Sequence, residues 1–135
     1  MEIIANFLGG CQFNVISGSH ELVCDQPREN GGEDAGMSPP ELLLASLATC
    51  AGYYASEYLK TRGLPAKGLQ VRVAAEKAKQ PARFGAFLIE VIVPGLEERH
   101  QAAILRAVKS CLVHNTLVER PSIEVVIQCP AVLAA

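Results

Sequence analysis

Two of the five cysteines, Cys50 and Cys111, have the setting that redox chemistry with paired thiols requires. A cysteine reacts as its thiolate, and a second thiol within reach can resolve the resulting sulfenic acid as a disulfide. Both residues fall in apolar segments that we expect to form two buried helices of one core, whereas Cys11, Cys24 and Cys129 fall beside strands or near the tail. The alternative interpretation is plain packing, because free cysteine is among the most buried residue types.

A buried thiol has a raised pKa, so Cys50 needs a neighbouring cation if it is to react. It lies 12 residues after the expected start of its helix at Ser38, about 18 Å at 1.5 Å per residue, which is too far for the helix dipole to help. Arg28 is the candidate cation, because its polar loop leads directly into this helix. The alternative is that Arg28 is a solvated loop charge.

Cys111 also has two histidines in the same half of the chain, His100 and His114, which raises the question of a metal site. Structural metal sites in proteins usually group several closely spaced cysteines and histidines. Here His114 is three positions after Cys111 and there is no second cysteine nearby. We therefore expect no metal site.

The helix that carries Cys50 has the clearest local signals in the chain. Ser38, a proline at the first helical position and Glu41 three residues after the cap form a capping box, and Gly63 with Pro65 ends the helix near residue 62. Residues 42–56 contain no charge over 15 residues, whereas a membrane span needs about 20. We interpret this as a core helix that must be covered on all sides, because almost every face is apolar.

The remaining elements follow from apolar periodicity and turn residues. Three short antiparallel strands are expected within residues 3–24, followed by a loop over residues 25–37 and, after the helix, by a hairpin that turns near Gln80-Pro81. A second helix places Ile104, Ala107, Val108 and Cys111 on one face. Asn115-Thr116 can then cap a turn before a last strand with alternating Ile123, Val125 and Ile127.

This order of elements predicts an α+β fold of antiparallel sheets with helices laid on them, in one domain over residues 1–135. The first helix has more apolar surface than a few short strands can cover, so we expect a symmetric homodimer. The net charge of −2 without a basic run argues against nucleic acid as a partner. The absence of a signal-peptide pattern and the odd, scattered cysteines predict a cytoplasmic protein with reduced thiols and no membrane association.

Two segments together resemble the OsmC/Ohr superfamily. Residues 31–50, GGEDAGMSPPELLLASLATC, are similar to its helix-entry motif, and residues 111–117, CLVHNTL, are similar to its second cysteine motif. The resemblance implies antiparallel sheets wrapped around two buried helices in an intertwined homodimer, with sites at the interface. It also implies a peroxidatic Cys50, a resolving Cys111, and reduction by an external thiol or a lipoyl-type dithiol, with no metal or bound organic cofactor.

The chain departs from the peroxidase branches at the residues that activate the first cysteine. Those branches have a glutamate ten residues before it, paired with an arginine from the preceding loop, and here that position is Pro40. Glu41 is one residue late, which turns its side chain by about 100° round the helix. Arg28 matches the arginine only if the loop is about two residues longer. The sequence thus looks like the less characterised OsmC-like branch rather than classical Ohr or OsmC.

The residues and the resemblance together favour two alternative functions. The first is a cysteine-based hydroperoxide reductase in oxidative or osmotic stress defence, acting on a small organic hydroperoxide. The second is a binding or redox-sensing protein that holds a small hydrophobic or thiol-containing ligand in an apolar pocket at the dimer interface. A reactive Cys50 distinguishes the first from the second.

Overall fold

The computed structural model describes residues 1–131 and has the predicted α+β architecture. Its elements are three N-terminal strands, a short 3-10 helix, a long helix, a hairpin and two further helices: β1 (Ile4–Gly9), β2 (Gln12–Ser17), β3 (His20–Cys24), η1 (Arg28–Asn30), α1 (Pro39–Thr61), β4 (Gln70–Lys79), β5 (Ala82–Ile92), α2 (Glu98–Lys109) and α3 (Leu112–Val118). The strands form two separate antiparallel sheets, β1-β2-β3 and β4-β5.

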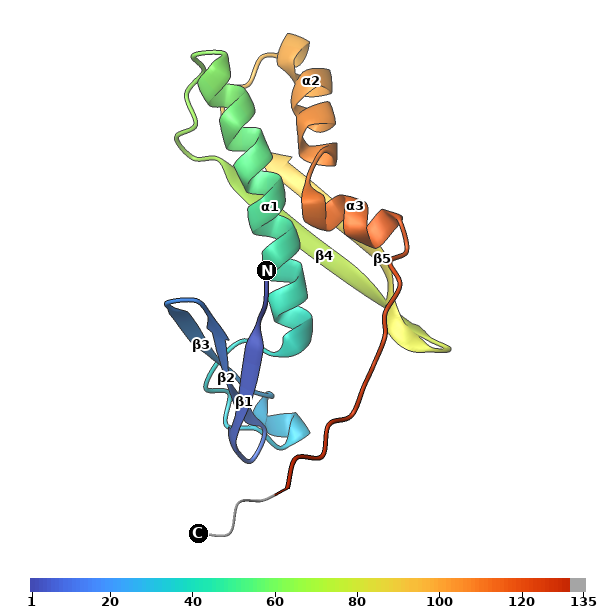
Figure 1. The fold of residues 1–135 in the computed structure, drawn as a ribbon. Coiled ribbons are helices and arrows are strands. Elements are labelled where there is room, and N and C mark those ends of the chain that lie inside the picture. The colour runs from blue at the N-terminus through green and yellow to red at the C-terminus, as the bar shows by residue number, and fades with distance from the viewer. Residues whose placement is uncertain (132–135) are drawn as a thin grey trace.

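The N-terminal sheet is a meander of three short strands with apolar side chains left open. Phe7 pairs with Phe13 across β1 and β2, and Phe13 pairs with Cys24 across β2 and β3. Figure 1 shows this sheet beside the start of α1, apart from the β4-β5 hairpin. Among the residues of its three strands only Cys24 is buried, and Phe7 is 66% exposed.

Helix α1 begins as the sequence predicts. The backbone N–H and the hydroxyl of Ser38 both donate hydrogen bonds to Oε2 of Glu41, and each donor–acceptor distance is 2.7 Å, so the capping box forms. The helix ends at Thr61 and is followed by Gly63 with a φ of 64°, a left-handed backbone that glycine adopts at little cost. Of the helices in residues 1–131, none has both the length and the hydropathy needed to cross a membrane.

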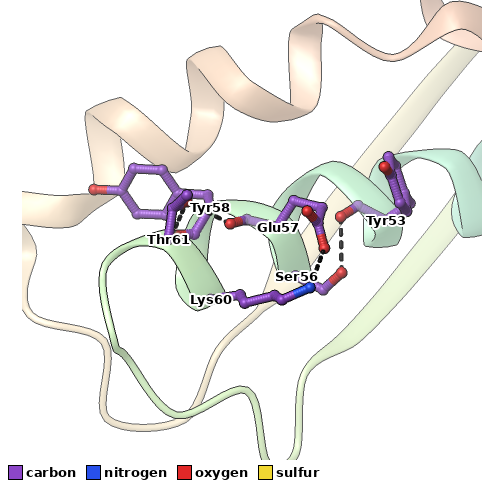
Figure 2. A network of polar contacts seen from close by, with 6 residues as sticks. All are labelled: Tyr53, Ser56, Glu57, Tyr58, Lys60 and Thr61. Carbon is purple, nitrogen blue, oxygen red and sulfur yellow. Dashed lines mark hydrogen bonds and ion pairs between the residues drawn. The ribbon is translucent and has the colours of Figure 1, made fainter.

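The core lies along one face of α1. Its buried residues Leu47, Ala51, Ala55 and Leu59 recur every four positions and form one stripe, which packs against the hairpin and against Ile104 and Val108 of α2. The single chain leaves part of α1 uncovered, since Tyr53 is 60% exposed, and its coverage by a partner chain stays a prediction. Figure 2 shows that the last turns carry a polar face, where Lys60 lies 3.6 Å from Glu57.

Three expectations for the C-terminal third are wrong. The second helix stops at Lys109, so Cys111 lies at the junction with α3 and serves as its N-cap, and Asn115 and Thr116 lie inside α3 rather than capping a turn. The last strand does not form, since residues 120–131 are extended but pair with no sheet. Ile123, Val125 and Ile127 are more than 80% exposed. An alternating segment becomes a strand only when it pairs with a sheet edge, and within residues 1–131 this segment pairs with none.

Candidate functional site

The structure brings Cys50 and Cys111 together as neighbouring free thiols. Cys50 lies in the middle of α1 and is half-buried, whereas Cys111 is fully buried at the junction of α2 and α3. Helix α3 contacts α1, and the side chain of Cys50 is close enough to affect the ionisation of Cys111. The two thiol groups are therefore close neighbours in the fold.

The two thiols differ in their surroundings. Burial raises the pKa of the Cys111 thiol, and its interaction with Cys50 raises it further. The backbone N–H of His114 donates a hydrogen bond to Sγ of Cys111 at a distance of 3.3 Å. This bond stabilises the thiolate and lowers the pKa of Cys111. Because burial is the largest effect, Cys111 is held in its protonated form more strongly than an ordinary cysteine.

Arg28 does not lie with the cysteine pair in the single chain. It is exposed on η1, and the loop around it is attached to the N-terminal sheet, where Sγ of Cys11 approaches the carbonyl oxygen of Gly31 at 3.5 Å. Within residues 1–131 its guanidinium has no hydrogen bond and no ion pair. The cation is thus free to interact with a group from outside its own chain.

The carboxylate of Glu41 accepts hydrogen bonds from Ser38 at the start of α1. Hydrogen bonds from Ser38, the hydroxyl first and the backbone N–H second, lower the pKa of its carboxyl group. It lies nine positions before Cys50 in the helix, about 13 Å along the axis. Glu41 therefore acts as a cap in this structure.

The sequence reasoning missed Asp25, which organises the loop that carries Arg28. Its side chain is buried, and its carboxylate accepts hydrogen bonds from four donors: the backbone N–H groups of Gln26 (2.7 Å), Glu33 (3.0 Å) and Ala35 (3.1 Å) and the side-chain amide of Gln12 (3.3 Å). These bonds, chiefly the one from Ala35, lower the pKa of Asp25 despite its burial. The loop is therefore closed at both ends on one ionised carboxylate.

Close backbone contacts reinforce this loop closure. A Cβ atom at Gly32 would lie 1.8 Å from the carbonyl oxygen of Gln26, and one at Gly36 would lie 2.0 Å from that of Val23. Only glycine fits at either position without a shift of the backbone. A polar residue at the end of a strand, followed by a glycine-containing loop, is the pattern that could have indicated this arrangement.

The histidines considered as metal ligands lie in different surroundings. Nδ1 of His100 is 2.9 Å from the hydroxyl of Tyr58, near the end of α1, and Nδ1 of His114 is 3.2 Å from the side-chain oxygen of Asn115. No cluster of three metal-binding side chains occurs within residues 1–131.

A cavity of about 690 Å³ adjoins the cysteine pair. Its walls come from α1, β5, α2 and α3, and they include Leu47, one turn before Cys50, and His114, one turn after Cys111. Neither cysteine lines it. The volume is in the range of sites for small organic ligands, about 300–1,000 Å³.

Comparisons with known proteins show the family to which the chain belongs. Residues 31–126 match the family model described as OsmC-like protein. The chain belongs to this family. The match includes both cysteines and Glu41 and begins after Arg28. No curated protein matches the chain.

Solved structures share the OsmC-like fold at low sequence identity. A protein from Psychrobacter arcticus superimposes with a TM-score of 0.76 at 21% identity, over 84% of this chain and 85% of the other. An OsmC-like protein from Mycoplasma pneumoniae superimposes with a TM-score of 0.70 at 23% identity, over 88% of this chain and 87% of the other. An organic hydroperoxide resistance protein from Elizabethkingia anophelis superimposes with a TM-score of 0.58 at 21% identity, over 89% of this chain and 90% of the other. At these identities the likeness shows the fold.

We expect Cys50 of this OsmC-like protein to be alkylated by iodoacetamide at least about tenfold faster than Cys111, because Cys111 is shielded from the reagent and its burial raises the pKa of the thiol, which lowers the share of thiolate. Peptide mass spectrometry over time at pH 7.5 measures both rates in one sample. Denaturation in urea is the control, since both thiols should then react alike. Equal rates in the folded protein would contradict the assignment of Cys111 as the protected thiol.

We expect Asp25→Asn to open the loop that follows β3. The asparagine side chain has an NH₂ group in place of one carboxylate oxygen, and this NH₂ group would face N–H donors instead of accepting their hydrogen bonds. Hydrogen exchange at the amides of Glu33 and Ala35 should accelerate at least about tenfold. Asp34→Asn is the matched control, since Asp34 is exposed in the same loop and asparagine tolerates its positive φ of 60°.

The pH dependence of this loop follows from the lowered pKa of Asp25. A carboxylate with a depressed folded-state pKa stabilises the fold fully above its unfolded value, and the contribution is lost as pH falls through the folded value. In the parent protein, protection of Glu33 and Ala35, corrected for intrinsic exchange, should thus be unchanged from pH 7 to pH 5. It should fall below about pH 4, where the carboxylate of the open loop takes up a proton, and protection that stayed constant there would show that the pKa of Asp25 is not lowered in the closed loop.

Proposed function

We propose that this protein is a cysteine-based hydroperoxide reductase, and the observation that carries the proposal is the pairing of Cys50 with Cys111. The Cys50 thiolate attacks the terminal oxygen of a hydroperoxide, the O–O bond breaks, and the alkoxide takes a proton and leaves as an alcohol. Cys111 then attacks the sulfenic acid on Cys50, expelling water and closing a disulfide. An external thiol or a lipoyl-type dithiol restores both thiols by two exchange steps.

The different surroundings of the thiols support this division of roles. Cys50 is half-buried and can meet a substrate, whereas Cys111 is fully buried and its pKa is raised. A protected thiol suits the resolving step, because it reacts with the neighbouring sulfenic acid and is kept from the peroxide itself. No step uses a metal or an organic cofactor.

The active form that we propose is an intertwined homodimer, because apolar surface is left open in the single chain. The N-terminal sheet exposes Ile4, Phe7 and Leu8, and the tail exposes Ile123, Val125 and Ile127. Exposed strand edges with apolar side chains are surfaces that proteins normally pair or cover. A second copy would cover the sheet and offer the tail an edge with which to pair.

Within this dimer we assign Arg28 as the cation that activates Cys50 of the other copy. Arg28 is exposed and without a partner inside residues 1–131, and the Asp25 carboxylate holds the loop that presents it. A guanidinium beside a thiol stabilises the thiolate and lowers its pKa. Glu41 keeps its role as a cap. A cytoplasmic location stays a prediction that rests on the five free cysteines.

The cavity beside the cysteines favours a second candidate function, a non-enzymatic binding or redox-sensing protein. It is predominantly apolar and about 690 Å³ in volume, and no cysteine lines it. In that case Cys50 and Cys111 would pack against each other or report the redox state without turning over peroxide.

Peroxide consumption by the reduced protein tests the proposed reaction. One equivalent of cumene hydroperoxide is mixed with the protein in a stopped-flow instrument, and peroxide loss is followed with and without a dithiol. The proposal predicts consumption at least about 100-fold faster than by free cysteine at the same pH, a difference of about 2.7 kcal/mol in the barrier. Consumption no faster than by free cysteine would reject the reductase and leave the binding protein.

A further inference from the structure

Two tyrosines lie beside Cys50 on α1. Successive residues of a helix are turned by about 100°, so Tyr54 lies about 40° round the helix from Cys50 and Tyr53 about 60° in the opposite direction. Helical side chains lean toward the N-terminus and cover the turn before their own. Both tyrosine rings therefore extend over the turn that carries Cys50.

The two rings pack against each other in a defined orientation. Their centroids are 5.4 Å apart and their planes meet at 86°, which is the edge-to-face contact that aromatic pairs prefer. Tyr54 is half-buried, whereas Tyr53 is 60% exposed. Tyr54 is thus both nearer to Cys50 round the helix and better shielded from water.

The hydroxyl groups near Cys50 on α1 differ in what they bind. Ser46 and Thr49 each donate a hydrogen bond to a backbone carbonyl oxygen of the preceding turn, at a distance of 2.8 Å. The hydroxyls of Tyr53 and Tyr54 have no hydrogen-bond partner within residues 1–131, in contrast to the third tyrosine of the chain, which is bound to a histidine. Only the two tyrosines therefore have a hydroxyl proton that is free for a substrate.

The alkoxide that leaves in the proposed reaction needs such a proton. An alkoxide is a strong base, and a general acid that supplies the proton as the O–O bond breaks contributes about 10²–10⁴-fold to the rate. Arg28 is poorly suited to this step, because arginine does not release its proton in proteins. The thiol of Cys111 is a weak donor, and it has to attack Cys50 in the next step.

We propose that Tyr54 is the general acid that protonates the leaving alkoxide, an inference that rests on the proposed reductase function. An electron pair of the Cys50 thiolate forms an S–O bond with the terminal peroxide oxygen, which keeps its hydrogen. The O–O bond breaks, and the departing oxygen takes the phenolic proton of Tyr54. Cys50 is thereby oxidised to the sulfenic acid and the hydroperoxide is reduced to an alcohol. The tyrosinate then takes a proton from water.

Oxidants with different leaving groups test this role. In stopped-flow measurements of the first turnover, Tyr54→Phe should react with cumene hydroperoxide about 100-fold more slowly than the parent protein. With perbenzoic acid the rate should change by less than about twofold, because benzoate leaves as a stable anion and needs no proton. A substitution that only disturbed the packing around Cys50 would slow both oxidants alike.

Tyr53→Phe is the matched control, since it removes a hydroxyl at the adjacent position and keeps the contact between the rings. Its rates with both oxidants should equal those of the parent protein. Alkylation of Cys50 by iodoacetamide should be the same in the parent protein and in both variants, because iodide leaves without a proton.

Three results would overturn the role of Tyr54 and leave the reductase in place: equal slowing of Tyr54→Phe with both oxidants, an unchanged rate of Tyr54→Phe with cumene hydroperoxide, or a loss of rate in Tyr53→Phe instead. A parent protein that consumes cumene hydroperoxide no faster than free cysteine would reject the reductase, and the role of Tyr54 with it. The two failures are distinguishable, because the first appears only in the variants and the second already in the parent protein.

Discussion

Replacing Cys50 by serine should lower the rate of hydroperoxide consumption by about 1000-fold, equivalent to about 4 kcal/mol of barrier. The serine hydroxyl is almost fully protonated at neutral pH and cannot form a sulfenic acid, so the attacking group is lost while the fold is kept. Stopped-flow measurement of cumene hydroperoxide loss gives both rates.

Two further variants identify what is lost in Cys50→Ser. Cys111→Ser should retain the first turnover and then stop after one equivalent of peroxide, with a sulfenic acid on Cys50 that dimedone traps. Cys24→Ser is the matched control, because Cys24 is also a buried free thiol and should be fully active. Full activity of Cys50→Ser would eliminate it as the attacking residue.

The second large effect concerns assembly. The parent protein should sediment as a dimer, and Val125→Asp should weaken the dimer at least about 100-fold, because it would place an unpaired carboxylate in a covered apolar surface, at a cost of about 3 kcal/mol. Phe7→Asp, on the N-terminal sheet, should behave in the same way. Both side chains are well exposed in the single chain, so the folded monomer should survive both changes.

Analytical ultracentrifugation at micromolar concentration measures this effect. Ala102→Asp is the control, since it adds a carboxylate at an exposed position of α2 that we do not assign to the interface. In the dissociated variants Cys50 should also react more slowly with peroxide, because Arg28 of the other copy is removed. A monomeric parent protein, or dimers unaffected by both substitutions, would contradict the intertwined assembly.

Local signals in the sequence predicted the elements that depend on local chemistry. The capping box of Ser38 and Glu41 and the stop at Gly63 define α1, and alternating residues around a Gln80-Pro81 turn define the hairpin. Each of these signals acts within a few residues, so it can be interpreted without knowledge of the remaining fold. The α+β class followed from their order.

Features that depend on distant partners were not predictable in this way. The tail with Ile123 and Val125 alternates as a strand does, but a strand forms only by pairing with an edge, and the tail pairs with none of the sheet edges in residues 1–131. Cys111 continues the helical spacing of α2, yet the backbone turns at Ser110 and makes it the N-cap of a new helix.

The candidate site was predictable in part. The cysteine pair was identified from the type and setting of the two residues, and the contact between α1 and α3 then brings them together. The role of Asp25 was missed because two of its donors, the amides of Glu33 and Ala35, come from residues eight and ten positions further along the chain. Arg28 remains a prediction, since its proposed partner lies in a second copy.

Mapping the oxidised cysteines tests the central claim most directly. The reduced protein is treated with one equivalent of cumene hydroperoxide, quenched with an alkylating agent and digested for mass spectrometry. We predict one disulfide per chain, between Cys50 and Cys111, with Cys11, Cys24 and Cys129 recovered as alkylated thiols. Recovery of both Cys50 and Cys111 as thiols after the peroxide has been consumed, or a disulfide that excludes Cys50, would contradict it.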